Sequence, residues 1–491
     1  MKPGLVAVLL GCAGSLRRAL SRNSHLFSCA AALLTLAGFA QAIEPVRSNV
    51  LGGVGRNLLA IYRELVEIDT MQPAGDTTVA ARAMAKHLLD AGFDAADVQV
   101  LEPYPHRGNL VARLRGTGEM RPLLLLAHLD VVPARKEDWS GDLDPARLTE
   151  RDGYFYGRGT LDDKAMGSIF VANMARMKRE GFRPKRDIIL ALTADEEAGE
   201  HNGVDWLVEH RRDLIEAELA LNEGGMGTWR DGVAYMQGVQ VSEKMYQSYS
   251  LEATSAGGHS SLPERDNAIY ELARALDGVA ALEFPARLTD ATRRYFGAIG
   301  ATEVGSLVPA IGAVARGTPT DIELRAVSTI PRFNAQLRTT CVATRLEGGH
   351  ADNALPARAR AVVNCRLLPG EEPSFVHAQL QGAAGDRVKV TAMNHARPSP
   401  PADLESPAMK TIERVCESMW PGVPVVPLMS AGATDGAPLR NAGISVYGVS
   451  GIFLEHGENR MHGRDERIPV RSFFEAARFL DRLARELAQG R

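Results

Sequence analysis

Two apolar runs of strand length, separated by one helix, constrain the fold of this chain more than any other feature. The first run covers 122–128 and ends in His128, and the second covers 187–193. Strands that are apolar at every position are typical of a sheet covered by helices on both faces. Between the runs, 164–180 has helical character and stops at Gly181. Strand, helix and strand in this order predict an α/β layer with right-handed crossovers.

Further segments extend this pattern along the chain. Near the two ends, helical or strand-like apolar patterns occur at 57–69, 80–89, 109–114, 445–449 and 472–487. The middle of the chain differs. The strand-like segments 246–254 and 359–367 alternate between apolar and polar residues, 387–392 is a further strand, and 267–279 has the pattern of a helix. Alternating strands with helices on one side are typical of a smaller α+β sheet. Residues 284–333 form an irregular segment with proline and glycine in which we expect helices.

The length of 491 residues exceeds what one compact core accommodates, so two or three domains are expected. We predict one α/β domain of three layers from 49–244 and 398–491, with an α+β domain inserted at 245–397. The net charge is −4, and acidic and basic residues are interspersed. A nucleic-acid-binding protein would show a clustered basic face, so we expect no nucleic-acid partner.

The first 42 residues have the pattern of a secretory signal peptide. Three arginines precede an apolar run at 26–40, which ends in the small-residue sequence Ala40-Gln41-Ala42. Cleavage after Ala42 would place the protein in the periplasm or outside the cell. The run is short for a bilayer span, so we expect no stable membrane span. An uncleaved anchor, a lipid on Cys12, a wrongly chosen start codon and a non-secreted protein remain alternatives.

Cleavage at that point would remove Cys12 and Cys29 and leave Cys341, Cys365 and Cys416. Three cysteines are an odd number, and their spacing is not that of metal ligands. A disulfide between Cys341 and Cys365 is compatible with export. Buried free thiols are an equally valid interpretation of the sequence.

Five short segments carry acidic residues or histidines at strand ends or in glycine-rich loops, where α/β sheets bind ligands. They contain His128 with Asp130, Asp162, Glu196 with Glu197, Glu223, and His462. Each segment by itself has an ordinary explanation, such as a buried histidine, a helix cap, a solvated turn or a polar loop. Together they offer two imidazoles and several carboxylates, which Zn²⁺ accepts and which two-metal amide hydrolases use.

The chemistry of these residues suggests distinct roles. A metal-binding histidine usually donates its other ring proton to an acceptor, and Asp130 stands two residues after His128. A carboxylate such as Asp162 can bridge two cations. Adjacent carboxylates point apart, so Glu197 can bind metal while Glu196 serves as general base.

The motifs H-x-D, G-x-x-D-D-K, D-E-E, E-G-G, G-G-H-S and H-G-x-D-E occur in the order found in one metallopeptidase family. Over nearly the whole chain after residue 50, the sequence resembles the family of acetylornithine deacetylase, succinyl-diaminopimelate desuccinylase, aminoacylase, carnosinase and glutamate carboxypeptidase. The resemblance implies a zinc-peptidase-like catalytic domain with two zinc ions per subunit. One zinc would be held by His128, Asp162 and Glu223, and the other by Asp162, Glu197 and His462. Glu196 would activate water, and Asp130 would orient His128.

The inserted domain resembles the lid and dimerisation domain of this family, so the resemblance implies a homodimer. In relatives, the histidine that matches His259 reaches the partner subunit's active site and stabilises the oxyanion. Arg366 matches an arginine that binds a substrate carboxylate. Asn353 and Asp435 match residues of nearby substrate-binding loops. The sequence departs from the family at Ala165, where glycine is usual, and at Asp465, where asparagine is common.

Glu223 is informative, because relatives with glutamate there resemble carboxypeptidases and aminoacylases, and relatives with aspartate resemble dipeptidases and aminopeptidases. The context is most similar to Gly-X carboxypeptidase and N-acyl amino acid hydrolases. We therefore expect a zinc hydrolase that cleaves the C-terminal amide of a small peptide or an N-acyl amino acid with a metal-activated water. A dipeptidase of the same chemistry and a catalytically silent binding protein are the alternatives.

Overall fold

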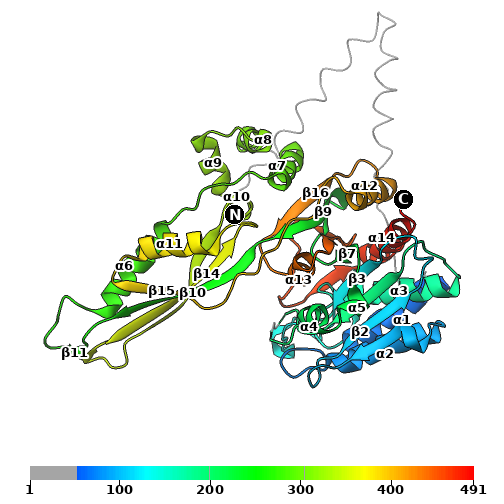
Figure 1. The fold of residues 1–491 in the computed structure, drawn as a ribbon, viewed down its shortest axis with the longest axis horizontal. Helices are drawn as coiled ribbons and strands as arrows, with labels where there is room; N and C mark the ends of the chain where they lie inside the picture. The colour runs from blue at the N-terminus through cyan, green and yellow to red at the C-terminus, as the bar shows by residue number, and fades with distance from the viewer. Residues whose placement is uncertain (1–51, 198–199, 303–304) are drawn as a thin grey trace, which may run out of the picture. The chain divides into compact units, whose positions relative to one another are not determined.

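A computed structural model describes residues 52–197, 200–302 and 305–491 (Figure 1). The expected signal peptide at 1–42 lies outside these residues, and so do Cys12 and Cys29. The described residues belong to one compact unit that begins at Val46. Within the described ranges, no helix combines the length and the apolar character that crossing a bilayer requires.

A large mixed sheet forms the middle layer of the α/β domain. Its hydrogen-bonded order is β1 (Val98–Leu101), β2 (Asn109–Leu114), β6 (Ile188–Thr193), β3 (Leu123–His128), β7 (Leu219–Asn222), β17 (Ser445–Gly448), β9 (Val233–Glu243), β8 (Gly227–Arg230) and β18 (Phe453–Glu455), and β16 (Val425–Ser430) also pairs with β9. The two apolar runs of the sequence are β3 and β6. They are parallel neighbours, and α3 (Lys164–Arg179) connects them along the chain, so the expected strand–helix–strand unit is confirmed.

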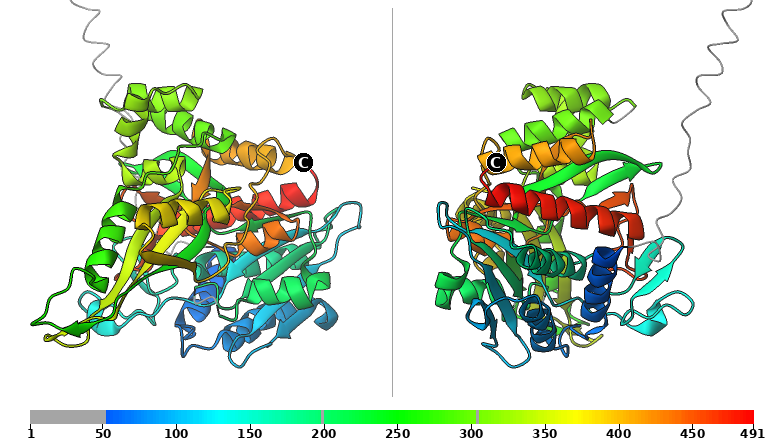
Figure 2. Two further views of the ribbon diagram at one scale, coloured as in Figure 1. Left: turned by 60° about the vertical axis from the view of Figure 1, so that its left-hand side comes forward. Right: turned by 90° about the vertical axis from the view of Figure 1, so that its right-hand side faces the viewer.

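Helices cover both faces of this sheet (Figures 1 and 2). The burial of the β3 side chains explains why. Successive residues of a strand point to opposite faces. Leu123, Leu125 and Ala127 pack with the helices of one face, whereas Leu124 and Leu126 pack with those of the other. The first group of helices is α1 (Gly53–Glu67), α2 (Thr77–Asp90), α3, α12 (Pro407–Met419) and α14 (Val470–Ala488). The second group is α4 (Gly203–His210), α5 (Arg212–Ile215) and α13 (Gly436–Asn441). The expected three layers are therefore present.

A second, antiparallel sheet occupies the middle of the chain. Its strand order is β12 (Thr340–Gly348), β14 (Arg358–Leu367), β10 (Met245–Thr254) and β15 (Val388–Ala392). Helices α6 (Ala268–Ala281) and α11 (Pro373–Ala384) share an apolar core with one face of this sheet. The expected α+β arrangement is thus present, and β9 runs into β10 with only Lys244 between them.

The segment expected to be helical contains α7 (Asp290–Thr302), α8 (Val308–Arg316), α9 (Asp321–Ser328) and α10 (Pro331–Leu337). These helices share a small apolar core, which Val426 of the large sheet joins. Phe296 and Phe333 pack with Val426 of β16, and Met236 of β9 packs against the same cluster. This part of the inserted sequence is therefore anchored on strands of the large sheet. The sequence pattern of the helical segment did not indicate that it packs on β9 and β16.

The cysteines adopt one of the two arrangements that the sequence left open. Cys341 of β12 and Cys365 of β14 form a disulfide between directly paired residues. Cys416 is a buried free thiol in α12.

Candidate metal centre

Three parallel strands bring most of the expected ligands to one edge of the large sheet. His128 is the last residue of β3, where it pairs in register with Thr193, the last residue of β6. Glu196 and Glu197 follow β6, and Glu223 follows β7 on the other side of β3. Because neighbouring parallel strands end at the same edge, these side chains converge beyond the carboxyl ends.

Asp162 and His462 reach this edge by a different route. Strand β19 (Arg467–Pro469) pairs with β5 (Tyr154–Tyr156), which places the loop before β19 beside the turn after β5. Nη1 of Arg158 lies 2.6 Å from Oε2 of Glu466, and both side chains are buried. Nη2 of Arg158 donates to the carbonyl of Gly463 (3.0 Å), and Oε1 of Glu466 accepts from the amide of Leu161 (2.9 Å). This ion pair ties the His462 loop to the Asp162 turn.

The side chains of the centre lie within contact distance of one another. Nε2 of His128 is 2.9 Å from Oδ1 of Asp162, and Nε2 of His462 is 3.0 Å from Oδ2 of the same carboxylate. His462 also lies 2.9 Å from Oε1 of Glu197. Ligand atoms of His128, Asp162 and Glu197 fall within 4.8 Å of one another, and so do those of His128, Glu196 and Glu223. The structure thus brings all five expected ligands and the expected base together.

The donor set of this cluster fits bound cations. Oε1 of Glu197 is buried, and it lies 2.9 Å from Nε2 of His462. Burial raises the pKa of Glu196 and of Glu223 well above the usual range, and neighbouring carboxylates raise both further. Among the charges that act most strongly on Glu196, only that of His128 is positive. Crowded carboxylates of this kind are stabilised when a cation lies among them.

His462 gives a second indication of the same kind. Hydrogen bonds to Asp162 and Glu197 raise its pKa to about 10, so the imidazole carries a proton between two carboxylates. Metal binding to histidine requires the neutral ring and displaces such a proton. The residues present therefore suit metal ions, and imidazole and carboxylate ligands are those that Zn²⁺ accepts.

Asp130 lies beside His128 as expected, but its contacts are more specific than expected. Nδ1 of His128 lies 2.9 Å from the main-chain carbonyl of Asp130 and 3.7 Å from its carboxylate. The carboxylate oxygens accept instead from the amides of Glu196 and Glu197, both at 3.1 Å. One buried residue thus links the histidine to the loop that carries the expected base.

One residue of this centre and two of its neighbours have left-handed backbone conformations that non-glycine residues rarely adopt. Asp195, His462 and Asp465 have φ values of 59°, 60° and 55°. Such conformations persist where surrounding bonds hold them. Oδ1 of Asp195 accepts from Gln72 Nε2 (2.6 Å), and Asp465 accepts from the amide (2.8 Å) and hydroxyl (2.6 Å) of Ser140.

The expected substrate-binding residues fall into two places. Arg366 and Asp435 line a cleft of about 1190 Å³ that Glu196 and Glu197 also line. Asp435 is buried, and its carboxylate accepts from Asn202 (2.6 Å) and Thr193 (3.0 Å), the residues that flank the acidic loop. Burial raises the pKa of Asp435 to about 6. Asp435 thus braces the catalytic loop as well as bordering the cleft.

His259 and Asn353 lie elsewhere. His259 is in β11 (Gly258–His259), which pairs with β13 (Ala354–Leu355), and the carbonyl of Asn353 accepts from the amide of Ser260 (3.0 Å). Both side chains are exposed, and neither lines the cleft within this chain.

Sequence reasoning missed the buried ion pair that assembles the centre. Arg158 lies in the glycine-rich turn before Asp162, and Glu466 lies four residues after His462. Opposite charges beside two candidate ligands were a usable signal. Neither residue type indicates burial by itself, because charged residues are seldom fully buried unless they are paired.

Comparison with known proteins gives consistent matches. The model of the peptidase family M20/M25/M40 matches residues 124–486. The chain is 30% identical over 384 residues to the N-fatty-acyl-amino acid synthase/hydrolase PM20D1 of Xenopus tropicalis, covering 75% of this chain and 72% of that protein. It is 26% identical over 439 residues to aminoacylase-1 of Homo sapiens, covering 88% of this chain and 95% of that protein.

Solved structures share the fold. The M20 family metallo-carboxypeptidase Sso-CP2 from Sulfolobus solfataricus superposes with a TM-score of 0.67 at 18% identity, covering 87% of this chain and 98% of that chain. The Bacillus subtilis YXEP protein, a dinuclear metal-binding peptidase, gives a TM-score of 0.58 at 12% identity, covering 89% and 99%. The expected zinc-peptidase-like fold is confirmed.

Proposed function

Because this chain belongs to the peptidase family M20/M25/M40, it is a metal-dependent hydrolase of peptide or N-acyl amino acid amides, and we propose that it is a two-zinc carboxypeptidase or aminoacylase. One observation carries this proposal. The two oxygens of Asp162 face the Nε2 atoms of His128 and His462, at 2.9 and 3.0 Å. A carboxylate between two imidazoles is the arrangement expected of a ligand that bridges two ions.

The proposed division of the ligands follows the family resemblance. His128, Asp162 and Glu223 would hold one ion, and Asp162, Glu197 and His462 would hold the other. When bound, the ions supply Lewis acidity toward the amide carbonyl and lower the pKa of water.

The remaining chemistry is assigned to side chains of this protein. Glu196 accepts the proton of the attacking water and later transfers it to the leaving nitrogen. Burial and neighbouring carboxylates raise the pKa of Glu196, which suits a group that must both accept and return a proton. The carboxylate of Asp130 accepts a hydrogen bond from the amide of Glu196 and so positions the main chain from which this base extends.

Arg366 is proposed to bind the carboxylate of the substrate. Its guanidinium lies over the ring of Tyr246, 4.8 Å from the centroid, and no ion pair engages it among the described residues. An unpaired guanidinium in a catalytic cleft suits bidentate carboxylate binding. Both a peptide C-terminus and an N-acyl amino acid supply that carboxylate, and the relatives in the comparison include an N-fatty-acyl-amino acid synthase/hydrolase and an aminoacylase.

We further propose that the protein acts as a homodimer in the periplasm or outside the cell. His259 lies away from the cleft of its own chain, so a second copy would have to supply it as a donor to the developing oxyanion. The leader pattern at 1–42 supports export.

The decisive experiment replaces the proposed base. Glu196→Gln keeps the shape of the side chain and removes its ability to accept a proton, so kcat should fall at least about a thousandfold while zinc content is unchanged. Glu209→Gln, on the exposed end of α4, serves as the matched control. Near-normal turnover by Glu196→Gln would refute the assignment.

The substrate class needs its own measurement. N-acyl amino acids, blocked peptides and free dipeptides are offered to the zinc-loaded enzyme, and the released amine is identified. Preference for the acylated substrates supports the proposal. Preference for free dipeptides would identify a dipeptidase instead.

A further inference from the structure

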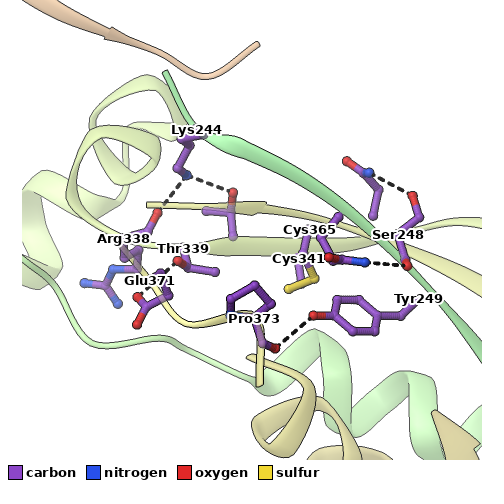
Figure 3. The surroundings of a disulfide bond; sticks show 12 residues. Lys244, Ser248, Tyr249, Arg338, Thr339, Cys341, Cys365, Glu371 and Pro373 are labelled. Carbon is purple, nitrogen blue, oxygen red and sulfur yellow. Dashed lines mark hydrogen bonds between the residues drawn. A yellow bond between two sulfur atoms is a disulfide. The ribbon is translucent and has the colours of Figure 1, made fainter. Parts of the chain in front are cut away.

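The disulfide between Cys341 and Cys365 joins the outermost strand of the smaller sheet to its neighbour (Figure 3). Cys365 is buried, whereas every residue of β12 after Cys341 is exposed. Among the strands that the structure describes, β12 pairs only with β14, and its register shifts between Ala343 and Arg345. A strand held from one side only opens more easily than a central strand. The disulfide therefore reinforces the beginning of an edge strand.

Arg366 lies in the row of residues next to this disulfide. Thr340, Arg366 and Tyr246 are directly paired across β12, β14 and β10, and Cys341 and Cys365 form the adjacent pair. Because neighbours on a strand point to opposite faces, the sulfur atoms pack toward the helix-covered face and Arg366 points to the open face. The open face borders the catalytic cleft, which Arg366 and Tyr246 line.

The same end of β12 is tied to the junction between the two sheets. Nζ of Lys244 donates to the carbonyl of Arg338 (2.7 Å) and to Oγ1 of Thr340 (3.2 Å) (Figure 3). Oγ1 of Thr339 accepts from the amide of Leu368 (3.0 Å), just after β14. These bonds all meet at the first residues of β12, so displacement of that end would be transmitted to the row that contains Arg366.

We propose that the Cys341–Cys365 disulfide is a positioning element for substrate binding, which holds Arg366 where it meets the substrate carboxylate. This inference rests on the carboxylate-binding role proposed for Arg366. It assigns the disulfide an effect on KM for carboxylate substrates, with little effect on the metal centre. The affinity of the enzyme for its substrates then depends on the redox state of this cystine.

The test uses the zinc-loaded full-length enzyme and a phosphine reductant. The phosphine is oxidised to its oxide with the oxygen atom of a water molecule, the S–S bond breaks, and the two sulfur atoms take up the two protons of that water to become thiols. KM for an N-acyl amino acid should rise roughly tenfold, as expected when a positioned group is displaced. The value of kcat and the zinc content should stay close to those of the untreated enzyme. KM for an N-acyl amine of the same acyl group, which lacks the carboxylate, should not change.

Variants separate the disulfide from other effects of the reductant. Cys341→Ala/Cys365→Ala should reproduce the raised KM and should not respond to the phosphine. Cys416→Ala removes the buried free thiol of α12 and should behave as the unmodified enzyme does. Reduction of the unmodified enzyme remains available as a measurement if the double variant folds poorly.

Arg366→Met distinguishes failure of this inference from failure of the proposed function. If Arg366→Met raises KM for the acid but neither reduction nor the double variant does, the disulfide has no positioning role and the proposed function stands. If none of the three raises KM, the carboxylate role of Arg366 is wrong, and the inference falls with it. Equal losses on the acid and the amine would show a general structural effect and would also overturn the inference.

Discussion

Arg158 and Glu466 form a fully buried ion pair, with Nη1 2.6 Å from Oε2, although they are separated by 308 positions in the chain. The arginine also donates to the carbonyls of His462 and Gly463, and the glutamate accepts from the amides of Leu161 and Asp162. The pair thus positions two proposed metal ligands through their main chains.

Arg158→Met should be strongly destabilising, because it leaves the carboxylate of Glu466 buried without its partner. Removing one member of a buried ion pair typically lowers the free energy of unfolding by about 3–5 kcal/mol. Zinc affinity should fall about 10- to 100-fold, as for other residues that orient ligands. Chemical denaturation and a competitive chelator titration measure the two effects.

A matched exposed pair provides the control for Arg158→Met. Arg135 contacts Asp138 at 2.9 Å, and its side chain is 78% exposed. Arg135→Met should change stability by less than about 1 kcal/mol and leave zinc binding intact. Equal effects of the two substitutions would contradict the assigned role of Arg158.

His462→Ala should remove one of the two proposed ions. His128, Asp162 and Glu223 can still hold the other ion, so the zinc content should fall to about one ion per chain. Activity should be lost, because two-metal hydrolysis needs both ions. Elemental analysis after gel filtration measures the content, and retention of the full zinc complement would rule out His462 as a ligand.

The proposed dimer predicts complementation between two inactive variants. His259→Ala lacks the donor that a partner supplies, and Glu196→Gln lacks the base. In a 1:1 mixture, half of the dimers are mixed and each of those contains one complete site, so about a quarter of full activity should return. The double variant His259→Ala/Glu196→Gln should rescue neither parent. A mixture as inactive as its components would show that the sites are not shared.

Lys244 predicts a pH dependence of stability. Burial, with the charge of Arg366, lowers its pKa to about 7, whereas an unfolded lysine has a pKa of about 10.4. Between these values the unfolded chain holds the proton and the folded protein does not, so stability rises with pH in this window. Below about pH 7 both states are protonated, and the destabilising contribution of Lys244 is constant.

Lys244→Met removes this titration. The unfolding free energy of the unmodified protein minus that of the variant should increase by about 1.4 kcal/mol per pH unit between about pH 7.5 and 10. Lost hydrogen bonds to Arg338 and Thr340 shift the whole curve without changing its slope. Denaturation of both proteins across this range measures the slope. A difference independent of pH would show that Lys244 titrates normally.

Much of the local structure could be predicted from the sequence. The apolar run at 122–128 is β3, the run at 187–193 is β6, and the helix between them is α3. Apolar periodicity indicated these elements because burial imposes it directly on each strand and helix. The ligand candidates were recognisable for a related reason, since they stand where strands end.

Other features could not be predicted. No sequence pattern connects the Asp162 turn with the His462 loop, and the pairing of β19 with β5 that joins them involves residues more than 300 positions apart. The helical segment at 290–337 showed no preference for β16, although Val426 completes its core. The sequence allowed a Cys341–Cys365 disulfide but could not choose it over free thiols, and the register of β12 and β14 decides this.

The helices and strands of this protein, and the chemical groups available to its site, follow from local sequence patterns, because periodicity and side-chain chemistry are local properties. Which of these groups meet depends on long-range packing. Asp162 faces both imidazoles because the Arg158–Glu466 pair and the β5–β19 ladder fold one loop onto another. Such contacts depend on the whole chain, since each partner is stable in its buried position only when the other is present.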